Sequence, residues 1–321
     1  MSQQRLLITG VGSELGSLAA SLLEQNSQFT DIVGIDVHPP RRRLRRTTYI
    51  RVEHDESAEF VQRIVSHRPD VIVHLGVWEP HGRLATNQAR VATGNYANAL
   101  CTALTQLDGL SRLVIRSGLE VYGMTHGLSP DENAAVAPSS TYGHMLAELE
   151  ATTAVAAPAT ATITTLRFAS VVGAHVPSPL GRLLRLPVIP FDPLSRAVFQ
   201  VLSDDDAARA VVHAATHGHH GVVNVAAQEP VTVAAAARQG RRLVAPVVPN
   251  TWTIAAQLTT LAGAPLPDHV IELLRHGRTA STCVDDIGYR PTQTTSEVIA
   301  DLFSWASVVR FAPNRRTEQV A

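Results

Sequence analysis

The sequence predicts an α/β fold in which a doubly wound parallel sheet carries helices on both faces. Short apolar runs alternate with segments of helical periodicity over residues 1–170. The run at 70–77 is apolar on both sides, as the central strands of a parallel sheet are. Such alternation is typical of βαβ units, whose successive strands are parallel.

The expected elements follow one another along the chain. Strands are expected at 6–9, 31–36, 48–52, 70–77, 113–117 and 163–168. Helices are expected from the first glycine turn to about residue 23, and then at 57–67, 83–106 and 142–156. The last of these helices ends before Pro158, because proline cannot continue a helix.

A glycine-spaced turn after the first strand suggests a ligand. Gly10, Gly12 and Gly16 have the spacing G-x-G-x-x-x-G, one residue longer than the usual dinucleotide-binding spacing. The N-terminus of the following helix offers free N–H groups to a pyrophosphate, and glycine lets a phosphate approach the main chain. An ordinary strand-to-helix turn is the alternative. The cofactor contacts expected here are Gly10, Gly12, Ser13, Glu14, Leu15 and Gly16.

The second strand ends in Asp36, which lies 20 residues beyond Gly16. A carboxylate at this place accepts hydrogen bonds from ribose hydroxyls and repels a 2′-phosphate, which favours NAD over NADP. The arginine-rich run at 41–46 argues the other way, because a guanidinium such as that of Arg41 can hold a 2′-phosphate. The choice between NAD(H) and NADP(H) therefore stays open.

The pattern of residue types along the chain changes after residue 170. Prolines break 177–193 into turns, and a strand at 198–202, a helix from Asp204 to His217 and a strand at 222–225 follow. Residues 231–311 are expected to form mostly short helices. We therefore predict a dinucleotide-binding domain of 1–170 plus about 198–225. A smaller substrate-binding domain would consist of about 171–197 and 226–312, with a tail at 313–321.

Composition narrows the classes of function. The chain has 321 residues, 45% of them apolar, and a formal net charge of −1, which gives no reason to expect nucleic acid or a membrane as partner. No apolar run is long enough to span a bilayer and no signal peptide is recognised, so we expect a soluble cytoplasmic protein. Cys101 and Cys283 suggest neither a disulfide framework nor a metal cluster, and no metal is expected.

A set of short motifs follows a fixed order over roughly residues 5–300. They lie at 9–16, 36, 74–76, 95, 117–123, 142–143, 166–173, 203–210 and 288–291. In this order they resemble the extended short-chain dehydrogenase/reductases, the NAD-dependent epimerase/dehydratase-like proteins. All 27 basic residues are arginine, and this lysine-free composition is similar to that of an actinobacterial member. The resemblance implies a Rossmann sheet, further cofactor contacts at Leu75, Gly76 and Phe168, and a homodimer through the helices at 83–106 and 142–156.

The resemblance also implies a catalytic set that is incomplete in this chain. The family uses a Ser or Thr after the fifth strand and a Tyr-x-x-x-Lys pair on the next helix. Its tyrosine matches Tyr142, but its lysine matches Leu146 and its Ser or Thr matches Gly118. Without a neighbouring lysine we expect the pKa of Tyr142 to lie near its ordinary value of about 10. Carbonyl reduction would then be less impaired than alcohol oxidation.

Several side chains on segments that lead to the carboxyl edge of the predicted sheet are candidates for substrate contact. Ser170 stands where nucleotide-sugar epimerases tend to have Asn, and Glu120 stands where dehydratases have an acid, but its neighbour Leu119 replaces their Asp. Any of Trp78, Arg116, Tyr122 and His144 could bind substrate or act as a substitute acid, with packing or a solvated loop as the alternative for each. The candidate substrate-binding residues are Trp78, Ser117, Tyr122, His144 and Ser170.

Three functional hypotheses follow. The first is an atypical NAD(P)H-dependent oxidoreductase that reduces a ketone on a hydrophobic small molecule, such as a polyketide-like secondary metabolite. The second is a catalytically silent NAD(P)-binding or regulatory protein on the same fold. The third is a lyase, cyclase or isomerase without net redox chemistry.

Overall fold

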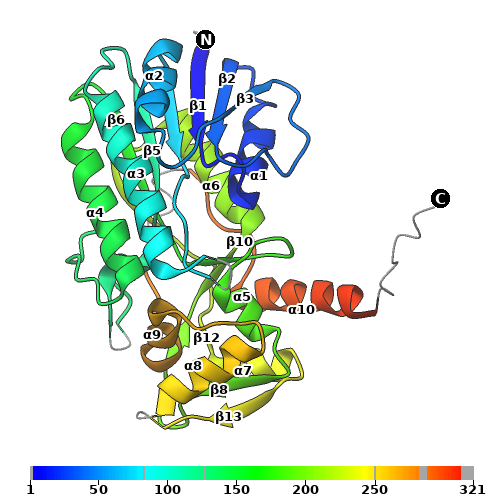
Figure 1. Ribbon diagram of the computed structural model, residues 1–321. Helices are drawn as coiled ribbons and strands as arrows, with labels where there is room; N and C mark the ends of the chain where they lie inside the picture. The colour runs from blue at the N-terminus through cyan, green and yellow to red at the C-terminus, as the bar shows by residue number, and fades with distance from the viewer. Residues whose placement is uncertain (1–2, 82–83, 126–127, 249–250, 282–287, 312–321) are drawn as a thin grey trace.

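The computed structural model describes residues 3–81, 84–125, 128–248, 251–281 and 288–311. Its central sheet is parallel throughout, with the strand order β11-β6-β5-β4-β1-β2-β3 (Figure 1). The order of the strands reverses between β1 and β4, which is where doubly wound sheets bind ligands outside the strand ends. The strands are β1 (Gln4–Thr9), β2 (Phe29–Asp36), β3 (Thr47–Arg51), β4 (Val71–His74), β5 (Arg112–Gly118), β6 (Thr162–Phe168) and β11 (Gly221–Val225).

Helices cover both faces of this sheet, which confirms the predicted fold class. On one face α3 (Thr86–Leu104) packs between α2 (Ser57–His67) and α4 (Thr141–Ala156), as Figure 1 shows. On the other face α1 (Glu14–Leu23) packs against α6 (Asp204–His217). No helix in the described ranges combines the length and the apolar character needed to cross a membrane.

Two element boundaries differ from the sequence-based expectation for identifiable reasons. The strand expected at 70–77 ends at His74, and residues 75–77 turn into the ligand-binding edge. The run 198–202 forms two strands, because β9 (Val198–Phe199) pairs with β12 (Val231–Thr232) while β10 (Val201–Ser203) pairs with β7 (Ser170–Val172). Buried Gln200 lies between them, and its side-chain amide donates to the carbonyl of Ala227.

The segment after β11 contains more than short helices. It includes α7 (Val233–Gln239), α8 (Trp252–Leu261), α9 (Asp268–His276) and α10 (Thr295–Phe311), but also β12 and β13 (Leu243–Pro246). β13 pairs with β8 (Val188–Phe191), which follows α5 (Pro179–Leu184). The expected tail at 313–321 lies outside the described residues.

Buried apolar side chains form two clusters. The larger one lies around the central sheet, and the smaller one gathers residues of α5, β8, α7, α9 and α10, below the sheet in Figure 1. This grouping supports treating 171–197 and 226–312 as a separate unit, a division that stays a proposal.

A buried ion pair joins β5, β6 and α4. The guanidinium of Arg167 donates to both carboxylate oxygens of Glu150, at 2.9 and 2.6 Å, and to the hydroxyl of Tyr122 at 2.8 Å. The Ser117 hydroxyl donates to the same carboxylate at 2.5 Å. A forked, charge-assisted arrangement of this kind fixes the elements that carry it.

We expect Arg167→Met to lower the free energy of unfolding by about 3–5 kcal/mol, because Glu150 would remain as a buried charge without its partner. Urea denaturation followed by circular dichroism measures this. The control is Arg63→Met, which removes the exposed Arg63–Glu59 pair on α2 and should cost less than about 1 kcal/mol. Equal losses in the two variants would contradict the structural role of Arg167.

Candidate functional site

A cavity of about 360 Å³ opens at the carboxyl edge of the sheet, around the point where the strand order reverses. It is lined by the glycine turn, the end of β2, the loop after β4 and Arg116 of β5. Gly16 and Phe168 are not among the described residues of its wall. The lining residues that the sequence analysis assigned to cofactor or substrate are Gly10, Gly12, Ser13, Glu14, Leu15, Asp36, Arg41, Leu75, Gly76 and Trp78.

The glycine turn brings three stretches of main chain into close contact. Gly10 has φ +75°, and a Cβ there would lie 2.5 Å from the carbonyl carbon of Leu75. A Cβ on Gly12 would overlap the carbonyl oxygen of His38. Ser13, at the middle family glycine, caps α1 by accepting from the N–H of Gly16 and donating to the carbonyl of Gly10, both at 2.9 Å. The turn is therefore reshaped around a cap and remains open to the cavity.

The carboxylate of Asp36 is held against this turn. One oxygen accepts from the N–H of Gly12 at 2.9 Å, and the other accepts from the N–H of His38 at 3.0 Å. Burial raises the pKa of Asp36, although these hydrogen bonds oppose the shift. The side chain thus presents a fixed acceptor to the cavity at the end of β2.

The arginine run mainly fixes its own loop. Arg42 pairs with buried Glu14 at 2.8 Å, so the acid at the start of α1 has a counter-charge. The guanidinium of Arg46 donates to the carbonyls of Glu24 and Phe29, and the backbone N–H groups of 45–47 donate to the Glu24 carboxylate. Within this run it is Arg41 that lines the cavity.

The positions of the missing catalytic residues are filled. A Cβ on Gly118 would overlap a carboxylate oxygen of Glu120 and lie 3.1 Å from a methyl group of Leu146. Leu146 is fully buried, and the other oxygen of Glu120 forms a buried ion pair with Arg278 at 2.9 Å. The space beside the catalytic position is thus occupied by an internal ion pair and an apolar side chain.

Tyr142 is enclosed rather than poised as a base. Its ring is buried and lies 4.9 Å, centroid to centroid, from the ring of His269. Burial raises its pKa well above the ordinary value, and the charges of Glu79 and Glu120 add to the effect, while Arg116 opposes it. The expectation of a pKa near 10 is therefore wrong, because it ignored desolvation. Tyr142 is not among the described residues that line the cavity.

The remaining substrate candidates fall into two groups. The indole of Trp78 lies on the cavity wall and contacts the His54 ring at 4.5 Å. The hydroxyl of Ser117 is directed to Glu150, and that of Tyr122 to Asn224 and the carbonyl of Asp131. His144 is exposed on α4, and Ser170 is half-buried at the start of β7. Among the described residues, the structure does not bring these last four to the cavity wall.

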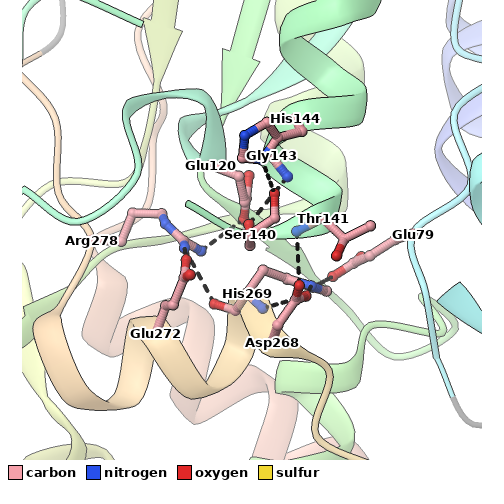
Figure 2. A network of polar contacts seen from close by, with 10 residues as sticks. All are labelled: Glu79, Glu120, Ser140, Thr141, Gly143, His144, Asp268, His269, Glu272 and Arg278. Atoms are coloured by element: carbon pink, nitrogen blue, oxygen red, sulfur yellow. Dashed lines mark hydrogen bonds and ion pairs between the residues drawn. The ribbon is translucent and has the colours of Figure 1, made fainter. Parts of the chain in front are cut away.

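A polar network that no sequence motif predicts lies between the start of α4 and α9 (Figure 2). His269 is 1% exposed, and its Nε2 lies 3.1 Å from a carboxylate oxygen of Glu79. Its Nδ1 lies 3.6 Å from Asp268, which accepts from the N–H of Thr141 at 2.7 Å. Burial alone would lower the pKa of His269, but Asp268 and Glu79 outweigh it and raise the pKa to about 9. His269 is therefore an imidazolium at neutral pH.

No sequence signal points to this network, because His269 and Glu79 are 190 residues apart. Among the described residues there is no group of three or more His, Cys, Asp or Glu that could hold a metal ion.

The raised pKa of His269 makes part of the stability pH-dependent. A histidine whose pKa is higher in the folded than in the unfolded state stabilises the fold when it is protonated. For His269 this stabilisation is complete below the unfolded-state pKa of about 6.5 and is lost as the pH rises through the folded-state pKa of about 9. Between pH 6.5 and 9.5 the free energy of unfolding should fall by on the order of 3 kcal/mol more in the native chain than in His269→Gln. Urea denaturation at both pH values measures the difference. His220→Gln, at an exposed histidine, should behave like the native chain, and identical pH dependence in all three proteins would refute the assignment.

Restoring the family lysine should not be tolerated. Leu146→Lys places an ammonium group in a fully buried site, so the free energy of unfolding should fall by several kcal/mol, on the order of 3–5. Leu146→Met conserves volume and should cost less than about 1.5 kcal/mol. A lysine variant as stable as the methionine variant would show that the site still accepts the family's cation.

Comparison with known proteins agrees with this geometry. The chain is 26% identical over 318 residues to protein Rv0501 of Mycobacterium tuberculosis, covering 93% of this chain and 83% of that relative. It resembles the crystal structure of UDP-glucose 4-epimerase with UDP-glucose from Thermotoga maritima, with a TM-score of 0.70 and 15% identity over 95% of this chain and 99% of that chain. It also resembles UDP-glucose 4-epimerase from Brucella ovis in complex with NAD, with a TM-score of 0.70 and 17% identity over 92% and 96% of the two chains.

The structural similarities establish the shared fold. The family assignment rests on the sequence, because residues 6–226 match the model of the NAD dependent epimerase/dehydratase family. This match includes the glycine turn, Asp36 and the Tyr142 helix, and it spans more than half of the chain. The protein therefore belongs to the NAD dependent epimerase/dehydratase family.

Proposed function

We propose that this chain binds NAD(H) in the cavity and acts as an oxidoreductase that reduces a carbonyl group on a hydrophobic small molecule. The observation that carries the proposal is the geometry of Asp36 and the glycine turn. A Cβ on Gly10 or Gly12 would overlap backbone atoms, so glycine at both positions allows the close packing that brings the turn, the start of α1 and Asp36 onto one cavity wall, where a pyrophosphate would lie against α1. Asp36 would accept the hydroxyl groups of the adenosine ribose.

The charges favour NAD(H) over NADP(H). Asp36 and Glu14 both lie on the wall of the cavity, and a 2′-phosphate near Asp36 would meet a like charge. Arg42 is already paired with Glu14, and Arg46 is bound to backbone carbonyls. Arg41 argues against this preference, because its positive charge also lies on the cavity wall and would attract a 2′-phosphate.

The state of Tyr142 supports reduction rather than oxidation. A tyrosine with a raised pKa keeps its proton at neutral pH, so it is a poor base for removing a proton from an alcohol. Bound NADH supplies the hydride, and the chain must position the carbonyl and provide a proton. Apolar side chains at the other end of the cavity favour a hydrophobic substrate, namely Val77, Trp78, Leu84, Val171, Val176 and Pro177.

A catalytically silent NAD(H)-binding protein is the second candidate. It is favoured by the enclosure of Tyr142 and by Glu120 and Leu146, which fill the space beside Gly118. Both candidates require the same cofactor site, so cofactor binding tests what they share and turnover separates them. A non-redox isomerase or lyase would convert its substrate while the bound cofactor returns unchanged.

Calorimetric titration with NADH and NADPH is the first test. We expect NADH to bind more tightly, and we expect Asp36→Asn to shift the affinity ratio toward NADPH by about tenfold, which corresponds to about 1.4 kcal/mol of removed repulsion. Asp55→Asn, at an exposed acid just after β3, is the matched control and should leave the ratio unchanged. Binding of neither cofactor by the native chain would refute the proposal.

A panel of aryl and cyclic ketones, assayed by loss of NADH absorbance, separates the two candidates. Stoichiometric oxidation of NADH with one of these ketones supports the oxidoreductase. Tight NADH binding without oxidation across the panel favours the silent binding protein.

A further inference from the structure

We propose that Glu79 and His269 form a proton-donating pair at this site, in which Glu79 passes the proton of His269 to the carbonyl oxygen of the substrate. This inference rests on the proposed reductase function and names the groups that would replace the family's tyrosine and lysine. It is carried by the position of Glu79 on the cavity wall and by its contact with a buried histidine.

Glu79 connects the cavity to the network behind it. It follows Trp78 in the loop after β4, and its side chain is 20% exposed. One carboxylate oxygen lies 3.1 Å from Nε2 of His269, and Figure 2 shows the side chain extended toward α9. A group in the cavity and a proton source outside it are therefore one hydrogen bond apart.

Acidic groups dominate the surroundings of His269. Asp268 on α9 faces Nδ1 and Glu79 faces Nε2, while Glu120 from the turn after β5 adds a further favourable charge. The Tyr142 ring on α4 lies tilted against the imidazole, with the two planes at 42°. These contacts keep the ring protonated at neutral pH although it is buried, so it can act as a proton reservoir.

Arg278, the guanidinium of this network, is bound to acidic side chains and to a backbone carbonyl. Arg278 pairs with Glu120 at 2.9 Å, lies 3.7 Å from Glu272, and donates to the backbone carbonyl of His269 at 3.2 Å. This guanidinium lowers the charge that Glu120 presents to the ring, yet the pKa of His269 still lies near 9. The imidazolium is therefore held by Asp268 and Glu79, the two carboxylates on its own ring nitrogens.

The step balances without any further reactant. Bound NADH would supply the hydride for the new C–H bond at the carbonyl carbon and would leave as NAD⁺, while the π-electron pair of the C=O bond moves to the oxygen. The Nε2 proton of His269 moves to the Glu79 carboxylate and from there to this oxygen, giving the alcohol. Neutral His269 keeps its Nδ1 proton, and Nε2 then regains a proton from solvent through Glu79, whose side chain is 20% exposed.

Tyr142 is less suited to this transfer than Glu79. Both residues lie beside His269, but Glu79 lines the cavity and Tyr142 is not among the described residues that do. The Tyr142 side chain interacts with Arg116, which lines the cavity, and a guanidinium does not pass on a proton. In this arrangement Tyr142 is a positioning residue that holds the imidazolium against Glu79.

The test uses the full chain with NADH and the ketone of the panel that it reduces fastest. Glu79→Gln keeps the shape and the hydrogen bond to His269 but cannot pass a proton, so kcat should fall by at least about 100-fold, within the usual range for loss of an acid catalyst. The dissociation constant of NADH should be unchanged. Glu272→Gln, at an acid of the same network outside the described cavity wall, is the control and should retain kcat.

The pH profile distinguishes proton donation from a structural role. In the native chain kcat should fall as pH rises through about 9, and His269→Gln should abolish this limb. If His269→Gln does not fold, ¹⁵N-histidine NMR of the native chain gives a second measurement. The spectra should then show a protonated histidine at pH 8 that is perturbed by Glu79→Gln.

The outcomes separate the two proposals. Undiminished turnover in Glu79→Gln overturns the proton-donating pair and leaves the proposed reductase function intact. The same holds if the native chain contains no histidine that is both protonated at pH 8 and perturbed by Glu79→Gln. NADH binding without turnover of any ketone by the native chain overturns both.

Discussion

The rest of the structure depends on the close approach of main-chain segments where the strand order of the sheet reverses. The glycine turn, the loop after β4 and the end of β2 come so near that side chains at Gly10 and Gly12 would overlap the backbone of Leu75 and His38. Asp36 fixes this contact by accepting from two backbone N–H groups. The cavity, the free end of α1 and the acid that faces the cofactor position all follow from this one constraint.

The sequence predicts this part well because its causes are local. Apolar runs, glycine spacing and an acid at a strand end are readable within a few residues, and the observed β1, α1 and β2 agree with them. The elements at 198–202 were misjudged for the opposite reason. Their division at Gln200 depends on pairing with β7 and β12, which no local pattern encodes.

The candidate chemistry was harder to predict because burial changes what each side chain does. Tyr142 was matched by its motif, but its pKa depends on the packing that encloses it. Ser117 and Tyr122 look like site residues in the sequence, yet their hydroxyls belong to the buried Arg167–Glu150 ion pair. Glu79 and His269 meet only through the tertiary fold.

The charges around Tyr142 follow from a chain that contains no lysine. An arginine on the family's helix position would carry a larger, planar group that needs bidentate partners, and the chain instead has Leu146 there. Positive charge enters from outside the helix, through Arg116 on β5 and through His269 and Arg278 from the C-terminal part of the chain. Of these three, only the imidazolium can release a proton near neutral pH, since a guanidinium stays protonated in proteins. In the proposed reductase, a histidine bound to a cavity carboxylate would therefore supply the proton, although the loss of the lysine removes the means to activate a tyrosine as a base.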